Sequence, residues 1–291
     1  MKICIIAADK NDYAPKHFFS ASTERKHETH LTLWENLSLK VENGISFISE
    51  KTDLISFDVI IPRSPAYYSK DDPTKRLDFH HIFSLLLQFS AENNIYFLNQ
   101  KYFSGYQGSN KFSQQYHLEI NALPGIPTYS EPPKKYPFVA KTIKGSQGIG
   151  VRLIKNEAER IDFQKAAKNS LLYQKYFPFS NDYRVLVVGG KSIGVIERIP
   201  QNEEWRANVS LGAKTVPVKG SEAIEISSLA EQVAKVMGLD YAGVDILRSN
   251  GKLYVIETNS LPQFVGFETA FPEVNVAEEL IRHIETAISV R

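Results

Sequence analysis

Cysteine is nearly absent from this sequence: its 291 residues include one, Cys4, which lies in an apolar run. A single cysteine cannot form a disulfide within the chain, which is typical of proteins from a reducing cytosol. The first ten residues, MKICIIAADK, hold too short an apolar run for a signal peptide. No later apolar segment is long enough to span a membrane. We therefore expect a cytoplasmic protein with no membrane partner, in which Cys4 belongs to the core.

An excess of either charge is also lacking. The chain has 34 Lys and Arg against 33 Asp and Glu, a net charge of +1, and no run rich in Lys or Arg. This balance indicates neither an acidic polymer nor a nucleic acid as a partner. What the chain does have is 43% hydrophobic residues, enough for a buried core and two or three subdomains.

The first hundred residues alternate between strand-like and helix-like patterns. Residues 2–8, 57–62 and 94–98 are apolar runs typical of buried strands. Residues 71–93 space their apolar side chains for one helix face, whereas residues 31–39 give only a weak strand or turn signal. This alternation predicts a small parallel α/β domain.

Arg63 and Ser64 directly follow the strand predicted at residues 57–62. Ligands of parallel sheets bind beyond the carboxyl ends of strands. The two residues are therefore candidates for holding a substrate carboxylate, although an ordinary strand-to-loop turn is the preferred interpretation.

A lysine and a glycine-rich loop share the segment PFVAKTIKGSQGIGV, residues 137–151. One strand is expected to end at Lys141, and another begins at Val151. The loop between them contains Gly145, Ser146, Gln147, Gly148 and Gly150. Glycine lets backbone N–H groups approach phosphate oxygens, and Lys141 would add a positive charge. The pattern is not a Walker A motif. It suits a flap over a nucleotide, but a glycine-rich hairpin turn has the same appearance.

Three hard oxygen donors stand in residues 243–268, GVDILRSNGKLYVIETNSLPQFVGFE: Asp245, Glu257 and Asn259. Two carboxylates and an amide oxygen suit Mg²⁺ or Mn²⁺ and do not suit zinc. A surface hairpin with solvated acids is the alternative. The break of the second strand at Pro262 favours a site, because functional side chains gather where a strand gives way to a loop.

The register of this hairpin decides whether the three donors meet. Glu257 and Asn259 share a face because they are two residues apart on a strand. A two-residue turn at Asn250-Gly251 would turn Asp245 to the other face. We therefore predict a turn of odd length centred on Asn250, which places Asp245 diagonal to Glu257, roughly 7–8 Å away and within bridging reach of one or two cations.

Three arginines, Arg184, Arg198 and Arg206, lie between the glycine loop and this hairpin. Arginine near a transferring phosphoryl group stabilises the charge that develops there. Their number and position favour phosphoryl-transfer chemistry.

In this order the features resemble the ATP-grasp superfamily and, within it, the RimK-type carboxylate–amine ligases, which add glutamate to the C-terminus of a ribosomal protein. The resemblance rests on Lys111, Lys141 and the segments KGSQGIGV, QKYF, DYR, WRAN, GVDIL and ETN. It runs from IPRSP to VGFE, nearly the whole chain.

This resemblance implies an ATP-grasp fold of mixed α/β and α+β type. Residues 1–103 would form a Rossmann-like α/β domain that precedes the ATP-grasp region. Residues 104–177 would form the N-terminal ATP-grasp subdomain with the nucleotide flap, and residues 178–291 the C-terminal subdomain with the metal and acceptor sites.

The resemblance also implies site residues. Those matching the ATP contacts are Lys111, Lys141, Gly145, Ser146, Gln147, Gly148, Gly150, Gln174, Lys175, Tyr176, Phe177, Asp182, Arg206 and Asn208. The backbone of Lys175 and Phe177 would bind adenine, and Asp182 would bind the ribose. Catalytic roles fall on Lys141, Arg184, Arg198 and Arg206, and the metal ligands are Asp245, Glu257 and Asn259.

The implied activity is ATP-dependent amide or peptide bond formation through an acyl phosphate, with Mg²⁺ or Mn²⁺, adding an amino acid such as glutamate to a peptide or protein. Two departures affect the substrate: Ser260-Leu261-Pro262-Gln263 replaces the family's Ser-Pro-Gly, and Ile199 replaces a second arginine. The alternatives are a ligase for free amino acids or dipeptides, a ligase acting on a carrier protein or a ribosomally made peptide, and an ATP-binding protein without turnover. Family members also form dimers or tetramers, and the sequence leaves the oligomeric state open.

Overall fold

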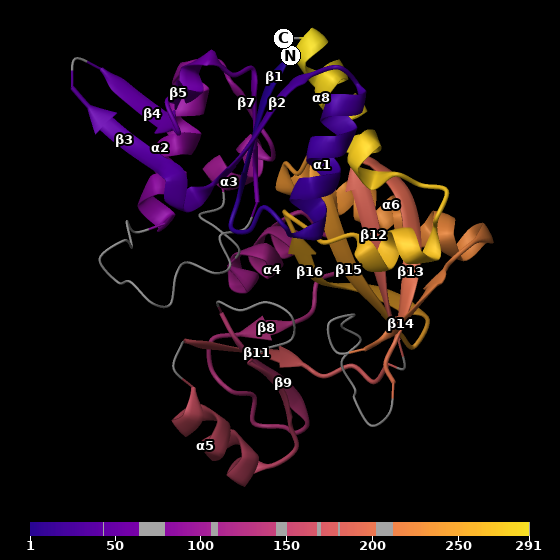
Figure 1. Cartoon of the computed structure of the whole chain (residues 1–291). Coiled ribbons are helices and arrows are strands. Elements are labelled where there is room, and N and C mark those ends of the chain that lie inside the picture. Colours follow the sequence, from indigo (N-terminus) through magenta and orange to yellow (C-terminus); the bar gives the residue numbers. More distant parts are fainter. Residues whose placement is uncertain are drawn as a thin grey trace. The chain divides into compact units, whose positions relative to one another are not determined.

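The computed structural model describes residues 1–42, 44–63, 79–105, 110–143, 150–167, 170–179, 181–201 and 212–290 (Figure 1). The chain divides into two compact units. The first contains Met1–Ser104, Gln263–Glu268 and Glu273–Arg291, and the second contains Gly105–Pro262 and Thr269–Pro272. The three-part division expected from the sequence stays a prediction.

A four-stranded parallel sheet in the order β2-β1-β6-β7 forms the centre of the first unit. Its strands are β1 (Lys2–Ala7), β2 (Glu28–Leu33), β6 (Val59–Pro62) and β7 (Tyr96–Phe97). Residues 3–7 of β1 are fully buried, as central strands of parallel sheets are. The parallel α/β arrangement expected from the sequence is confirmed. Burial also raises the pKa of the Cys4 thiol to about 12, so Cys4 is a core residue.

Helices and a small second sheet complete the first unit. The helices are α1 (Tyr13–Glu24), η1 (Trp34–Asn36), η2 (Leu54–Ser56), α2 (Phe79–Glu92), α3 (Gln100–Gly105), α7 (Val265–Ala270) and α8 (Val276–Ser289). The second sheet is antiparallel and consists of β3 (Leu37–Val41), β4 (Ile45–Ser49) and β5 (Thr52–Asp53). Leu37 and Phe47 from this sheet join the main core beside Trp34. The helix predicted over residues 71–93 is confirmed where it is described, and residues 71–78 and Ser64 lie outside the described residues.

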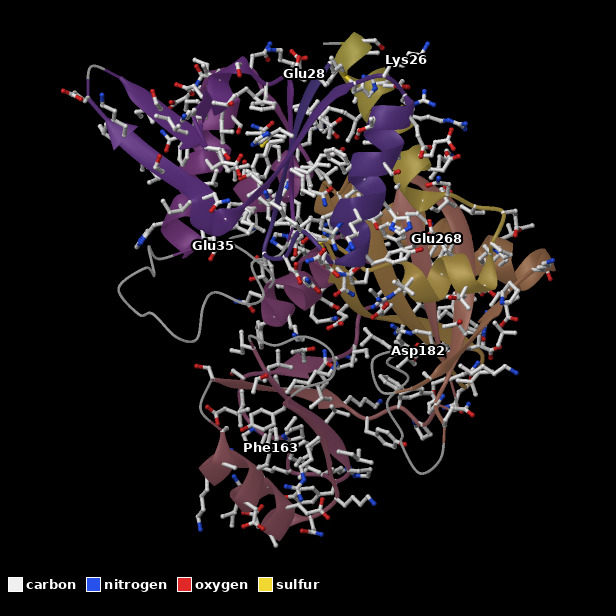
Figure 2. All side chains as sticks on the ribbon, in the orientation of Figure 1. Lys26, Glu28, Glu35, Phe163, Asp182 and Glu268 are labelled. Carbon is white, nitrogen blue, oxygen red and sulfur yellow. The ribbon has the colours of Figure 1, made fainter. Side chains whose placement is uncertain are left out.

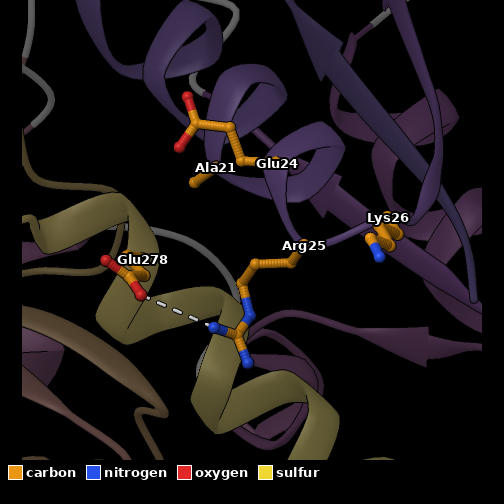
Figure 3. A pocket seen from close by; sticks show the side chains of 5 residues that line it. All are labelled: Ala21, Glu24, Arg25, Lys26 and Glu278. Atoms are coloured by element: carbon orange, nitrogen blue, oxygen red, sulfur yellow. Dashed lines mark hydrogen bonds and ion pairs between the residues drawn. The ribbon is translucent and has the colours of Figure 1, made fainter.

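Helix α8 packs beside α1, where a charged network joins them. Arg25 donates to both oxygens of Glu285, at 2.9 and 2.6 Å. A notch at this junction is lined by Ala21, Glu24, Arg25, Lys26 and Glu278 (Figure 3). Its arginine is already bonded to two carboxylates, so the network serves to attach the C-terminal helix.

Two antiparallel sheets form the second unit. The first, in the order β10-β9-β11-β8, consists of β8 (Thr128–Tyr129), β9 (Phe138–Thr142), β10 (Val151–Ile154) and β11 (Leu171–Lys175). One face packs Phe138 and Tyr173 against α5 (Glu157–Ala166), whose Phe163 is labelled in Figure 2. Side chains alternate along a strand, so the opposite face carries Lys141 and Gln174.

The second sheet has the order β14-β13-β12-β15-β16. Its strands are β12 (Asp182–Val188), β13 (Lys191–Ile199), β14 (Lys214–Pro217), β15 (Tyr241–Ser249) and β16 (Lys252–Asn259). Helix α6 (Gly220–Met237) buries its apolar stripe on one face. Helix α4 (Lys111–Ile120) lies along β16 and begins at the N-cap Asn110, whose side chain accepts the N–H of Phe112 at 2.9 Å.

Candidate active site

The turn between β15 and β16 contradicts the odd-length prediction. Ser249 pairs with Lys252, so the turn has two residues, Asn250 and Gly251. Their φ angles are 49° and 75°, both in the left-handed region that a type I′ turn requires. The prediction was wrong because it assumed that the two strands pair residue by residue, without a bulge, beyond the turn.

A β-bulge at Ile256 changes the register instead. Ile246 pairs with Val255, but Asp245 pairs with Glu257, leaving Ile256 as the extra residue. Val255 and Thr258 are therefore both buried, and Glu257 and Asn259 point to the other face. Asp245 lies directly opposite Glu257, where Cβ atoms are about 4.5–5.5 Å apart, closer than the predicted diagonal.

That face of the sheet gathers charged side chains from four strands. Arg184 holds both oxygens of Asp245, each at 2.7 Å. Arg198 holds both oxygens of Asp182, which is labelled in Figure 2, at 2.6 and 2.7 Å. The same Arg198 also reaches Asp245 at 3.2 Å. Two of the arginines and two of the acids predicted for the site therefore form one buried network.

Burial and neighbouring charge compete at these acids. Burial favours the neutral form of Asp245, but Arg184 and Arg198 outweigh it and hold the pKa of that carboxyl below its usual range. Burial raises the pKa of the Asp182 carboxyl to about 6, because Arg198 does not fully offset it. Burial disfavours the charged form of Arg198, yet the two carboxylates raise its pKa above the ordinary value.

The two predicted phosphate lysines share this neighbourhood. Lys141 is 8% exposed, and burial lowers the pKa of its ammonium group. Glu257 acts in the opposite direction, and the positive charge of Lys111 lowers the pKa further. Lys111 is the first residue of α4. Lys141 is thus within electrostatic reach of Lys111 and of the acids on this face of the sheet. The roles of both lysines toward phosphate stay predictions.

The segment predicted to bind adenine, residues 174–177, is attached to both sheets. Gln174 is 2% exposed, and its amide donates to the Thr128 hydroxyl at 3.0 Å. Phe177 stacks on Tyr254 of β16 with ring centroids 4.3 Å apart. Lys175 places its ammonium 5.0 Å from the Phe177 ring centroid. Tyr176 is half-buried.

Several predicted residues cannot be placed. Those outside the described residues are Gly145, Ser146, Gln147, Gly148, Arg206 and Asn208. Gly150, the last glycine of the loop, has a φ of 73°, and a Cβ there would lie 2.6 Å from Oγ1 of Thr142. That position therefore requires glycine.

Asp245, Glu257 and Asn259 fit a hard divalent cation by donor type. All three are on one face, and the Asn259 Nδ2 is buried without a hydrogen-bond partner among the residues described. An amide that turns can present its oxygen instead. Nowhere in the described parts of the chain do three His, Cys, Asp or Glu side chains gather as a possible metal site, so this set depends on the amide as its third donor.

Gly243 was not predicted to be a site residue. It pairs with Asn259, and a Cβ on it would lie 2.9 Å from the Cβ of Pro262 and 3.7 Å from Nε of Arg184. The segment after Asn259 returns over this glycine, where the Tyr241 hydroxyl donates to the Pro262 carbonyl at 3.2 Å.

Gly243→Ala should therefore destabilise the protein by about 1–3 kcal/mol, the usual cost of overpacking a buried position. Urea unfolding measures this. Gly105→Ala is the control, because a Cβ there meets nothing within 4 Å. Equal stability of the two variants would contradict the close packing of Pro262 on Gly243.

Known proteins share this fold. The solved structure of the ATP-grasp ligase PsnB with a phosphomimetic variant of its minimal precursor, Mg and ADP has a TM-score of 0.72 at 19% identity and covers 99% of this chain and 98% of that one. The macrocyclase MdnC bound with precursor peptide MdnA from Microcystis aeruginosa also has a TM-score of 0.72, at 11% identity, with 97% and 98% covered. These likenesses show that the chain has the ATP-grasp fold.

The sequence comparisons specify the family. Residues 114–284 match the family described as the RimK-like ATP-grasp domain. A probable alpha-L-glutamate ligase of Methanococcoides burtonii is 30% identical over 306 residues, 98% of this chain and 95% of the relative. One of Haemophilus influenzae is 36% identical over 172 residues, 57% of this chain and 54% of the relative. The chain belongs to the RimK-like ATP-grasp family, as its sequence motifs predicted.

Proposed function

We propose that this protein uses ATP and Mg²⁺ to add an amino acid such as glutamate to a peptide or protein. The observation that carries the proposal is the surroundings of Lys141, which lies within electrostatic reach of Lys111 and of the acids Asp245 and Glu257. Support for the substrate comes from relatives named probable alpha-L-glutamate ligases and from fold neighbours bound to precursor peptides.

In the proposed reaction, a carboxylate oxygen attacks the γ-phosphorus of ATP and ADP leaves. An amine nitrogen then attacks the acyl carbon, phosphate leaves, and the nitrogen loses a proton. Such transfers need positioning and charge neutralisation more than covalent catalysis by protein groups. Lys141 and Lys111 would neutralise phosphate oxygens, and Arg206 and Asn208 are predicted to lie near them.

The cation site would be held by Glu257, Asn259 and Asp245. A bound Mg²⁺ supplies charge neutralisation at the phosphate oxygens. Arg184 and Arg198 keep the Asp245 carboxylate ionised and fixed in orientation. We assign these two arginines a role toward Asp245, which supports catalysis by keeping the acid in place. Mn²⁺ is the alternative metal.

Three further properties stay predictions: residence in the cytosol, a dimer or tetramer, and the absence of nucleic-acid partners. No helix among the described residues is long and apolar enough to cross a membrane.

The test is ADP release with ATP and Mg²⁺ across amino acids, dipeptides and peptides ending in glutamate. ADP release together with a mass gain of one amino acid on a peptide supports the proposal. Release with free amino acids or dipeptides alone would identify a small-molecule ligase. Nucleotide binding without release under any acceptor would indicate a non-catalytic ATP-binding protein or a carrier-protein substrate.

Thr128 leads to a separate prediction, which concerns the nucleotide base that the proposed ATP site prefers. Its hydroxyl donates its one proton to the Ile126 carbonyl at 2.7 Å and accepts from the Gln174 amide at 3.0 Å. These two bonds fix the orientation of the Gln174 amide. Its Oε1 is buried and has no partner in the described structure, so it is the atom left to bind a ligand. A hydrogen-bond acceptor at this position favours adenine, whose amino group donates, over hypoxanthine, whose carbonyl only accepts.

We therefore expect Thr128→Val to reduce the preference for ADP over IDP by about tenfold, because the freed amide can turn. Calorimetry with Mg²⁺ measures both affinities. Thr128→Ser keeps the hydroxyl and should keep the preference. An unchanged preference in Thr128→Val would contradict the role of the hydroxyl.

A further inference from the structure

Strand β16 carries two of the predicted metal ligands and lies at the end of its sheet. Its outer edge therefore needs other partners for its backbone groups, because buried N–H and C=O groups are costly to leave unpaired. The residues after α4 supply one: the Val255 N–H donates to the Pro124 carbonyl at 2.7 Å. Gly125 forms a parallel bridge to the same Val255.

Gln115 of α4 holds the bulge itself. Its side-chain nitrogen donates to the carbonyl of Ile256, the extra residue, at 2.9 Å and to that of Val255 at 3.3 Å. Its side-chain oxygen accepts the Ile126 N–H at 2.8 Å. At 7% exposure, this one amide joins the bulge to the segment that follows α4.

Gln114 binds the next residues along the strand. Its nitrogen donates to the Thr258 carbonyl at 2.9 Å, and its oxygen accepts the Thr258 N–H at 3.0 Å. The amide thus replaces the backbone of a neighbouring strand. Thr258 stands between Glu257 and Asn259, so its two bonds fix the backbone that carries both side chains. Gln114 is 4% exposed.

We propose that Gln114 and Gln115 are positioning residues for the metal site, an inference that rests on the metal ligands assigned in the proposed function. A bulge can revert to regular pairing, and a shift of one residue would turn Glu257 and Asn259 to the face now occupied by Val255. The two amides bind the strand in its bulged register.

The same helix face links this support to the phosphate end of the site. Lys111, Gln114 and Gln115 stand at positions i, i+3 and i+4 of α4, which lie on one side of a helix. The helix that presents a predicted phosphate lysine therefore also fixes the strand of the metal ligands. A displacement of α4 would disturb both groups together.

Binding of Mn²⁺ in the presence of ADP, followed by electron paramagnetic resonance, tests the inference without turnover. Gln114→Met keeps the side-chain volume and removes both bonds to Thr258. Its Mn²⁺ affinity should fall by about 10- to 100-fold, the usual effect of losing a group that orients metal ligands. Gln164→Met is the matched control: its amide bonds Tyr173 at 2.6 Å and Arg160 at 2.6 Å, on the α5 side of the other sheet. Its affinity should equal that of the wild type.

Gln114→Asn provides a milder variant if Gln114→Met does not fold, because it keeps a neutral amide but shortens its reach. Faster hydrogen exchange at residues 257–259 in the metal-free variant should accompany its weaker Mn²⁺ binding. Wild-type Mn²⁺ affinity in a folded Gln114 variant overturns the inference alone. A wild-type protein that binds ADP but no Mn²⁺ overturns both the inference and the metal site of the proposed function.

Discussion

Glu257→Gln should leave the protein folded and remove ATP turnover, with a loss of at least about 10²–10³-fold. Glu257 is half-buried and stands opposite Asp245, so the change removes one of two carboxylates from the proposed cation site at constant shape. It also removes the charge that most supports the ionised form of Lys141, whose pKa burial already lowers. ADP release at saturating ATP and Mg²⁺ measures the effect.

Glu225→Gln is the control for this prediction. Glu225 is exposed on α6 and pairs with Arg248 at 2.7 Å, so the same change there should not alter turnover. If Glu257→Gln kept the turnover of the wild type, Glu257 would not be a metal ligand, whatever the fate of the other residues.

Local apolar patterns were sufficient to predict the central elements of the fold. Val59–Pro62 is fully buried, and its unbroken apolar run indicates a central parallel strand directly. Of the β3–β4–β5 sheet, only the start of β3, within residues 31–39, gave a weak signal, because the sheet is partly exposed: Val41 is 72% and Ile45 47% exposed. Its strands are defined by pairing with one another more than by their own sequence.

The bulge at Ile256 shows why the hairpin register could not be predicted. Asn250-Gly251 is a strong signal for a two-residue turn, and that signal was correct. The shift that brings Glu257 opposite Asp245 depends on Gln115, which is far away in the sequence and binds the Ile256 carbonyl. No pattern within the hairpin contains this information.

The ion-pair partners of Arg184 and Arg198 could not be predicted either, because they depend on the order of the strands in the sheet. Arg184 and Arg198 were expected to stabilise a transferring phosphoryl group, yet in the structure each holds a carboxylate. Because β13, β12 and β15 are adjacent, Asp182 lies opposite Arg198 and Arg184 lies opposite Asp245. Spacing along the chain identified the residues but not these pairs. Asp182 keeps its predicted role toward ribose only if a hydroxyl shares its oxygens with Arg198.

Arg198→Met should destabilise the protein by about 3–5 kcal/mol at neutral pH, because it leaves the buried carboxylate of Asp182 without its counter-charge. Arg198 is 2% exposed and binds both Asp182 and Asp245, which are 6% and 2% exposed. Urea unfolding measures the loss. Arg248→Met is the matched control, since the Arg248 side chain is 27% exposed and its ion pairs should contribute about 0–1 kcal/mol.

The stability deficit of Arg198→Met relative to the wild type should become smaller as the pH falls. Without Arg198, burial would raise the folded-state pKa of Asp182 still further above its unfolded value, so the folded variant would bind a proton at a higher pH and gain stability on acidification. Asp245 keeps Arg184 in the variant; in the wild type its pKa is lowered, so its contribution to stability is present above the unfolded pKa and is lost as the pH falls. The difference in stability between wild type and variant should therefore narrow as the pH falls toward about 6, the wild-type pKa of Asp182. A difference that stays constant over this range would mean that Arg198 stabilises the fold by packing and not by its charge.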